Sequence, residues 1–227
     1  MVKSKEANNS KINVNSLLRR LLVYVAGLFV LAVGVGVAVK SNLGISPVNS
    51  IPYVLSQVTG LDQGLLTTLV FCGFIVIQII LLRRDFKIIQ LLQVACATVF
   101  GYFVTLCNNL LAFPAPQSYP LKLVLTIISV ICVAGGMFLY LCGELIPQPA
   151  EGLCLAVEKK SGWKYSNIKV GFDCTLVFTA AVISLVAAGS VVGLREGTLI
   201  AMLSVGKIIG FMSARWKKGL MKFCAGE

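Results

Sequence analysis

Histidine is absent from the 227 residues, and acidic residues are scarce, with nine Asp and Glu against twenty Lys and Arg. Without histidine, the commonest metal ligand and general acid–base group is missing. The eight cysteines form no Cys-x-x-Cys pair, so they predict neither a zinc site nor a disulfide framework. A nucleophile elbow and a glycine-rich phosphate loop are also absent. These absences leave no recognised catalytic constellation, and we expect neither an enzyme nor a bound cofactor or metal.

Charge of either sign is rare, and long apolar runs dominate the chain. Charged residues make up 13% of the sequence and hydrophobic residues 57%, whereas soluble domains carry about 25% charged residues. Six apolar stretches have the ~17 to 25 residues that a helix needs to cross a bilayer. They are residues 17–39, 65–82, 88–111, 121–142, 168–192 and 198–216. The sequence therefore predicts an all-α membrane protein with six transmembrane helices, whose first partner is the lipid bilayer.

The positive charges orient these helices. Sixteen of the twenty Lys and Arg fall in one set of connections, namely 5 in the N-terminal segment, 3 at 83–87, 4 at 159–169 and 4 in the C-terminal tail. The opposite set holds Lys40, Lys122 and Arg195, and Lys207 lies inside the sixth stretch. Because cytosolic loops are enriched in Lys and Arg, both termini are expected in the cytosol of a bacterial inner membrane. This distribution reflects topology, so nucleic acid is not an expected partner.

The chain contains two copies of one plan. A shift of 102 residues aligns Pro47 with Pro149, Gly34 with Gly136 and the stop at Gly60 with that at Gly162. With six crossings the copies have opposite orientations, an inverted repeat that is found in many secondary transporters. The expected divisions are a disordered basic tail 1–16, a first three-span repeat 17–112, a linker 113–120, a second repeat 121–218 and a cytosolic tail 219–227.

Each repeat holds a short helical pattern between two spans, at 47–58 and 149–160. Ser46 before Pro47 is a favourable N-cap before a favourable first helical residue. About eleven helical residues reach ~16 Å, half a bilayer. If both segments re-enter the membrane, their N-termini meet near its middle, where their N–H groups favour anions or carboxylates. Flat interfacial helices or ordinary loop turns are the alternatives.

Polar residues near these helix starts form the predicted substrate site. They are Ser46, Asn49 and Ser50 from the first half, Gln148 and Glu151 from the second, and Lys207 from the sixth span. Lys207 lies about 12 Å deeper than Arg215, which costs roughly 2.5 kcal/mol or more without a partner or cavity. Asp173, Lys169 and Glu144 are candidates for coupling or for salt bridges. Structural pairs of Lys207 with Glu151 or Asp173, and of Lys169 with Asp173, are the simpler interpretation.

Four stretches carry a family resemblance: LGISPVNSIPYVLSQVTG, LLQVACATVFGYFV, PQPAEGLCLAVEKKSGWKYSNIKVGFD and REGTLIAMLSVGKIIGF. Through them the chain resembles the YczE/YyaS/YitT group of bacterial membrane proteins over nearly its whole length beyond residue 16. The resemblance implies an integral membrane protein with six spans and supplies no mechanism.

The leading functional hypothesis is a small secondary transporter that binds an unknown anionic or zwitterionic solute between the two half-helices. One alternative is the substrate-binding membrane subunit of a larger importer, docked through small-residue faces such as Gly34 and Gly36. Another is an accessory membrane protein whose charges are structural. A homodimer stays open as a further partner.

Overall fold

The computed structural model describes residues 14–112 and 114–225, and these residues form helices without a strand among them. The helices are α1 (Val14–Ser41), α2 (Pro47–Thr59), α3 (Gln63–Leu82), α4 (Leu92–Leu110), α5 (Tyr119–Gly143), α6 (Pro149–Ser161), α7 (Tyr165–Ala188) and α8 (Glu196–Ala225). Two short 3-10 turns, Arg83–Asp85 and Ile88–Leu91, join α3 to α4. Six helices are long and apolar enough to cross a membrane. The all-α class is therefore confirmed, and among the described residues each predicted span corresponds to one of these six long apolar helices.

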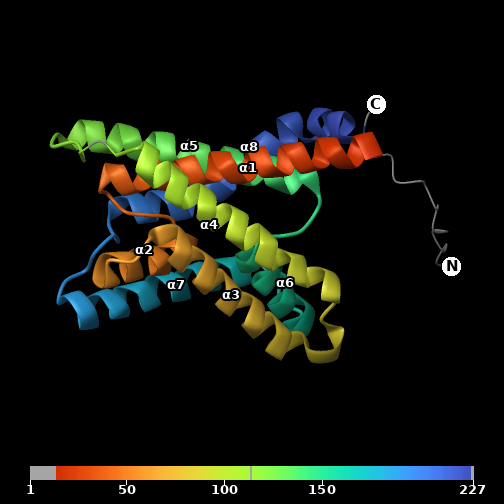
Figure 1. Ribbon diagram of the computed structural model, residues 1–227, viewed down its shortest axis with the longest axis horizontal. Helices are drawn as coiled ribbons and strands as arrows, with labels where there is room; N and C mark the ends of the chain where they lie inside the picture. Colours follow the sequence, from red (N-terminus) through yellow and green to blue (C-terminus); the bar gives the residue numbers. More distant parts are fainter. Residues whose placement is uncertain (1–13, 113, 226–227) are drawn as a thin grey trace.

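The predicted bounds shift by a few residues at most helices, and two of the larger differences are at the ends of α7 and α8. Helix α7 ends at Ala188 because Gly189 adopts a left-handed conformation with φ 66°. Helix α8 runs through the basic tail to Ala225, where the hydroxyl of Ser16 donates to the carbonyl of Cys224 at 2.7 Å. The predicted tail 1–16 lies outside the described residues, except for 14–16, which belong to α1. The start of α1 and the end of α8 therefore lie together (Figure 1).

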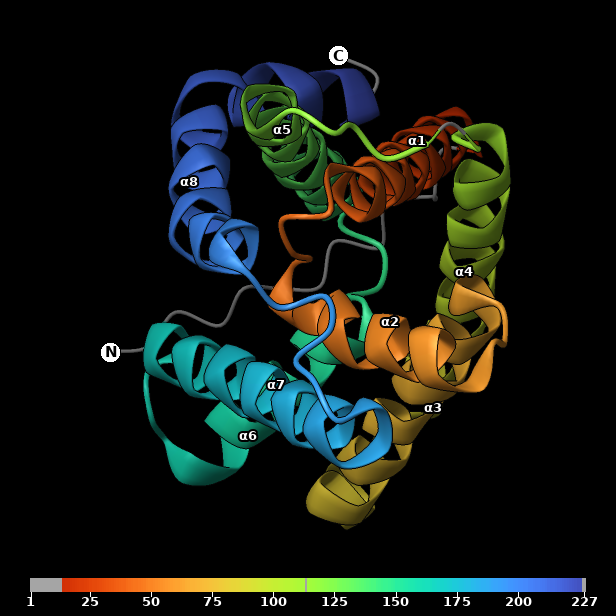
Figure 2. The ribbon, with the colours of Figure 1, turned by 90° about the vertical axis from the view of Figure 1, so that its left-hand side faces the viewer.

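The helices form two layers, and the α1–α5 pair is the centre of the first layer. Helices α1 and α5 run antiparallel side by side, with α4 against α1 and α8 against α5 (Figures 1 and 2). In the second layer the short helix α2 packs on α7, and α6 packs on α3. Each short helix thus contacts a long helix from the other half of the chain.

Glycines allow α1 and α5 to approach closely. A Cβ added to Gly34 would lie 2.7 Å from the backbone nitrogen of Val133, and one added to Gly136 would lie 2.7 Å from the carbonyl oxygen of Gly27. Small residues are typical of close helix crossings in membranes. The central crossing of the molecule is therefore a backbone-to-backbone contact that larger side chains cannot enter.

A similar crossing joins α3 to α4, whereas α7 and α8 lack one. A Cβ on Gly64 would strike the carbonyl oxygen of Gly101, and the Thr68 hydroxyl of α3 donates to the Ala97 carbonyl of α4 at 3.4 Å. In the described chain, α7 and α8 share no more than marginal contact. The two halves consequently differ in how their last two spans pack on each other.

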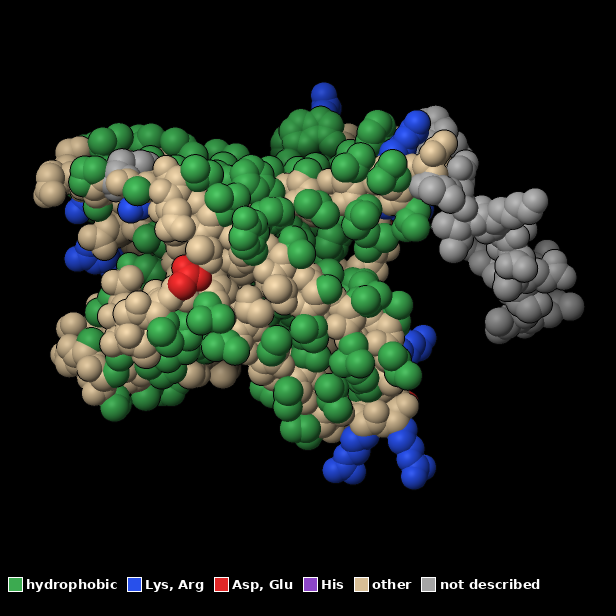
Figure 3. Space-filling model, in the orientation of Figure 1, with side chains coloured by type: hydrophobic (Ala, Val, Ile, Leu, Met, Phe, Trp, Pro, Cys, Tyr) green, Lys and Arg blue, Asp and Glu red, His purple; other side chains and the backbone are tan. Residues whose placement is uncertain are grey.

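The outer surface is largely apolar. Hydrophobic side chains cover the middle of the face in Figure 3, and most Lys and Arg project at its margins. Large side chains such as Phe178 on α7 and Phe211 on α8 are 70% and 66% exposed. Such exposure is expected of side chains in contact with lipid tails.

Candidate functional site

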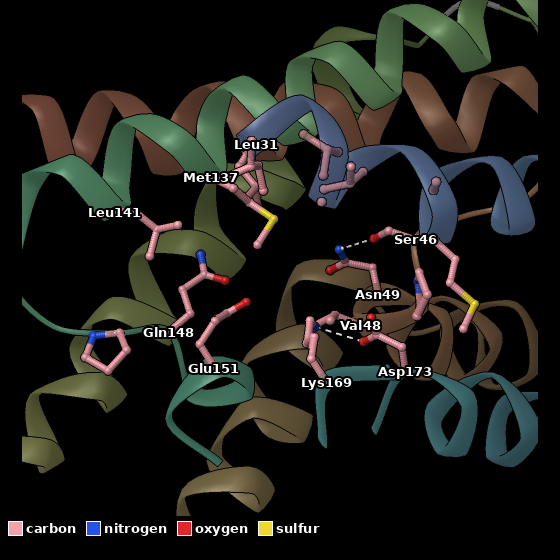
Figure 4. A pocket seen from close by; sticks show the side chains of 18 of the residues that line it. Leu31, Ser46, Val48, Asn49, Met137, Leu141, Gln148, Glu151, Lys169 and Asp173 are labelled. Carbon is pink, nitrogen blue, oxygen red and sulfur yellow. Dashed lines mark hydrogen bonds and ion pairs between the residues drawn. The ribbon is translucent and has the colours of Figure 1, made fainter. Parts of the chain in front are cut away.

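A cavity of about 630 Å³ lies where α2 and α6 begin, with walls from α1, α5, α7 and α8. Its polar lining residues are Ser46, Asn49, Gln148, Glu151, Tyr165, Ser166, Lys169 and Asp173. Ser46 and Asn49 approach it from one side, and Gln148 and Glu151 from the other (Figure 4). The structure therefore brings the two halves of the predicted site to one cavity.

Both helix starts face this cavity. Helices α2 and α6 begin at Pro47 and Pro149, directly after lining residues Ser46 and Gln148. Neither of the two preceding side chains caps its helix. Helix N-termini carry partial positive charge that attracts anionic groups. The cavity thus has two weakly positive poles that originate in different halves of the chain.

Two buried polar atoms at the cavity, Oδ1 of Asn49 and Nε2 of Gln148, have no hydrogen-bond partner among the described residues. Oε2 of Glu151 lies near the Tyr140 hydroxyl without a hydrogen bond of good geometry. Asn49, Gln148 and Glu151 are 4%, 4% and 6% exposed. A buried polar group without a partner costs about 1–3 kcal/mol, so such groups are rare in folded proteins. Together they offer two acceptors and one donor to a bound molecule.

One cation lies between two carboxylates at the same site. Nζ of Lys169 forms an ion pair with Oδ1 of Asp173 at 2.8 Å, one turn along α7. Lys169 also interacts electrostatically with Glu151. The predicted pair of Lys169 and Asp173 is thus present, and it joins Glu151 in a charged cluster. Two negative groups and one positive group favour a ligand that itself carries a positive group beside a negative one.

The start of α6 is held by an amide pair from α3 and α4. The Nε2 group of Gln78 donates to the Pro149 carbonyl and to Oε1 of Gln93, both at 3.0 Å. Both glutamines are fully buried, and a Cβ on Gly152 would lie 2.8 Å from each of them. The contact of the two glutamines with the start of α6 therefore fixes the positions of Gln148 and Glu151.

Replacing Gln78 with leucine is expected to destabilise the protein by about 1–3 kcal/mol, because the Gln93 amide and the Pro149 carbonyl then lose a buried partner. The double variant Gln78→Leu/Gln93→Leu should cost less than the sum of the two single changes, since the two amides satisfy each other. Thermal unfolding in one detergent measures all three variants. Additive costs would show that the amide pair does not anchor α6.

Three predicted site residues do not line the cavity. Ser50 is buried beside it, with its hydroxyl donating to the Pro47 carbonyl at 2.6 Å. Glu144 is an exposed residue that ends α5 in a left-handed conformation with φ 49°. Lys207 is exposed on α8. These three are therefore not carried into the proposed site.

The suggested pairs of Lys207 with Glu151 or Asp173 are wrong, since no ion pair joins them in the described chain. The cause is helix rotation. Helix α8 presents Met202, Val205 and Ile209 to the cavity. Each residue turns the helix by about 100°, so Lys207 points away from this face. Lys169 occupies the position beside the carboxylates instead.

Hydrogen bonds join the segment before α2 to the segment that leads into α8. The N–H of Ile45 donates to the Gly193 carbonyl at 3.2 Å, and the N–H of Gly197 donates to the Leu43 carbonyl at 2.7 Å. Arg195 adds a bond to the Asn42 carbonyl at 3.1 Å. We call these contacts between 42–45 and 193–197 the outer bridge, after the side of the membrane that the distribution of Lys and Arg predicts for these two segments. Away from this bridge, the lining residues Leu141 and Leu155 are 42% and 44% exposed.

These features define an integral multi-pass membrane protein with an open cavity lined by apolar side chains and a cluster of polar ones. The family of unknown function DUF6198 matches residues 18–214, and the chain belongs to this family. It is 27% identical over 196 residues to the uncharacterized membrane protein YczE of Bacillus subtilis (strain 168), covering 86% of each chain. The resemblance noted in the sequence is confirmed. No solved structure gives a significant match.

Proposed function

We propose that this protein is a secondary transporter of a small anionic or zwitterionic solute, which binds between the starts of α2 and α6. The observation that carries the proposal is the set of buried polar atoms on Asn49, Gln148 and Glu151 that lack a well-formed hydrogen bond among the described residues, all at one cavity. Binding would satisfy groups that are otherwise costly to bury. We assign no catalytic role to the chain.

An inverted repeat is the second part of the proposal. The 102-residue shift relates Pro47 to Pro149 as helix starts, and Gly60 to Gly162 as left-handed stops with φ 72° and 71°. The same shift relates the contact between α2 and α7 to the equivalent contact between α6 and α3. Antiparallel α1 and α5 suit a pseudo-two-fold axis between them (Figure 1). On this basis α2 and α6 are half-helices that re-enter the membrane from opposite sides.

Alternating access follows from the same symmetry. The shift maps the outer bridge onto residues 144–147 and 91–95. Among the backbone hydrogen bonds of the described residues, none joins these two segments. We infer that closing this second bridge and opening the outer one would expose the site to the other side. Charge places the open end, and both termini, in the cytosol of a bacterial inner membrane.

Cysteine accessibility tests the proposal. In a cysteine-free background, Asn49→Cys and Glu151→Cys should react with a membrane-impermeant maleimide from the cytosolic side, because both positions line the same open cavity. Arg195→Ala, which weakens the outer bridge, should shift this labelling toward the outside.

Ser50→Cys is the matched control, since residue 50 is 1% exposed and lies outside the cavity. It should stay unreactive from both sides. Equal labelling at 49, 50 and 151, insensitive to Arg195→Ala, would indicate surface helices and would remove the central site.

A further inference from the structure

The cavity has a sideways opening between α7 and α8. Val170 on α7 and Gly206 on α8 both line the cavity and are both exposed, Val170 at 57%. The two helices share only marginal contact within the described chain, and Figure 2 shows them apart on the same side of the molecule. The spans beside this gap expose large apolar side chains such as Leu203, at 66%. The opening therefore faces the lipid tails.

The cavity combines a polar cluster with an apolar border at this opening. The polar cluster holds Asn49, Glu151 and the Lys169–Asp173 pair. The lining residues on the two helices that flank the opening include the apolar Val170 on α7 and Met202, Val205 and Ile209 on α8. A volume of about 630 Å³ falls within the range of roughly 300–1,000 Å³ for drug-sized ligands. The space exceeds the need of a simple inorganic anion and suits a polar head joined to an apolar chain.

The polar cluster also selects the kind of head. Glu151 and Asp173 contribute two carboxylates near the single ammonium of Lys169, while the starts of α2 and α6 add partial positive charge. A head with separate positive and negative groups can match both. A second copy of the chain laid over the gap would cover the apolar rim but would leave the buried atoms of Asn49 and Gln148 without partners.

We propose that the ligand of this site is a single-chain amphiphile with a zwitterionic head, which enters from the bilayer between α7 and α8. Its head contacts Asn49, Gln148, Glu151 and Lys169, and its chain lies along α8 toward Gly206. This inference rests on the proposed function and names the class of solute that the cavity takes.

Two glycines on α8 provide a matched pair of variants. In the described chain, a Cβ added to Gly206 or to Gly210 meets no heavy atom within 4 Å, so both positions accept a larger side chain. Gly206 lines the cavity, and Gly210, one turn further, does not. Leucine at either position improves helix propensity over glycine. Gly206→Leu thus blocks the opening, whereas Gly210→Leu adds the same side chain away from it.

The experiment uses the full chain in nanodiscs that contain a small fraction of lysophosphatidylcholine with a photoreactive diazirine near its chain end. Irradiation should label the α8 face that carries Met202, Val205 and Ile209. Gly206→Leu should reduce this labelling by roughly tenfold, and Gly210→Leu by less than about twofold. Lysophosphatidylglycerol with the same diazirine should label more weakly, because its head lacks the positive group.

A soluble head group separates the polar cluster from the apolar border. Glycerophosphocholine has the same head as the lysolipid and no chain. It should protect the thiols of Ser46→Cys and Ser166→Cys variants from the maleimide, because both positions line the cavity and neither is a residue that we assign to the head group.

Three results would overturn the inference. Even labelling around all spans, unchanged by Gly206→Leu, would indicate boundary lipid only. Loss of a dimer on Gly206→Leu, measured by light scattering, would show that a second copy covers the gap. If glycerophosphocholine protected the introduced thiols but the lysolipid did not label α8, the central site would be supported and the proposal of an amphiphilic ligand would be wrong. Failure of the accessibility pattern itself would instead remove the proposed function.

Discussion

Replacing Gly136 with leucine is expected to destabilise the protein by at least about 3 kcal/mol, or to prevent recovery of a monodisperse protein. A Cβ at this position would lie 2.7 Å from the Gly27 carbonyl oxygen and 2.7 Å from the Cα of Leu31. These are backbone atoms, so neighbouring side chains cannot make room by changing rotamer. The α1–α5 crossing, which is the most extensive helix contact in the described chain, would have to separate.

The adjacent Gly135 provides the control. Its added Cβ would meet only the terminal methyl of Met212, at 3.9 Å, within the described residues. Gly135→Leu should therefore be tolerated and can gain up to about 1 kcal/mol from helix propensity. Gly136→Ala keeps the comparison measurable where the leucine variant does not fold, since one methyl group already meets the same backbone atoms. Equal melting temperatures for the alanine variant and the wild type would contradict the close crossing.

Replacing Lys169 with methionine is expected to destabilise the protein by about 3–5 kcal/mol, the range for removing one partner of a buried ion pair. The side chains of Lys169 and Asp173 are 23% and 14% exposed, and Glu151 is 6% exposed. Methionine preserves most of the length of the lysine stem. The loss of stability therefore comes mainly from the two carboxylates, which no longer have a cation beside them. Thermal unfolding in a neutral detergent measures the change.

A double-mutant cycle separates this charge effect from packing. Lys169→Met/Asp173→Asn should recover part of the loss, because Asp173 then no longer carries an unpaired charge. Lys207→Met is the matched control, as Lys207 lies exposed on α8 and forms no ion pair in the described chain. If Lys207→Met proved as costly as Lys169→Met, the cluster around Lys169 would not be the main charged contact of the interior.

Local signals in the sequence predicted the helix starts at the site. Proline suits the first helical position and glycine suits the left-handed stop. Both short helices accordingly begin at Pro47 and Pro149 and end one residue before Gly60 and Gly162. Asn49 and Glu151 could be placed near the cavity because each lies within the first turn after such a start.

Contacts between distant segments could not be predicted in this way. Gln78 and Gln93 meet only when α3 and α4 cross, and they then hold a third segment at Pro149. A glutamine inside an apolar span needs buried hydrogen-bond partners, but the identity of those partners depends on the register of two helices. Lys207 inside the sixth span likewise predicted a partner or cavity, and the rotation of α8 decided that it faces outward.

By itself, the sequence determined the class of protein, the number of spans and the limits of the short helices. Proline and glycine act on the backbone within a few residues, and the thickness of the bilayer sets the length of an apolar helix that crosses it. Tertiary structure alone decided that Lys169 rather than Lys207 joins the carboxylates, and that α7 and α8 stand apart while α3 and α4 interlock. Those outcomes depend on helix rotation and on close backbone packing, which single-chain patterns do not encode.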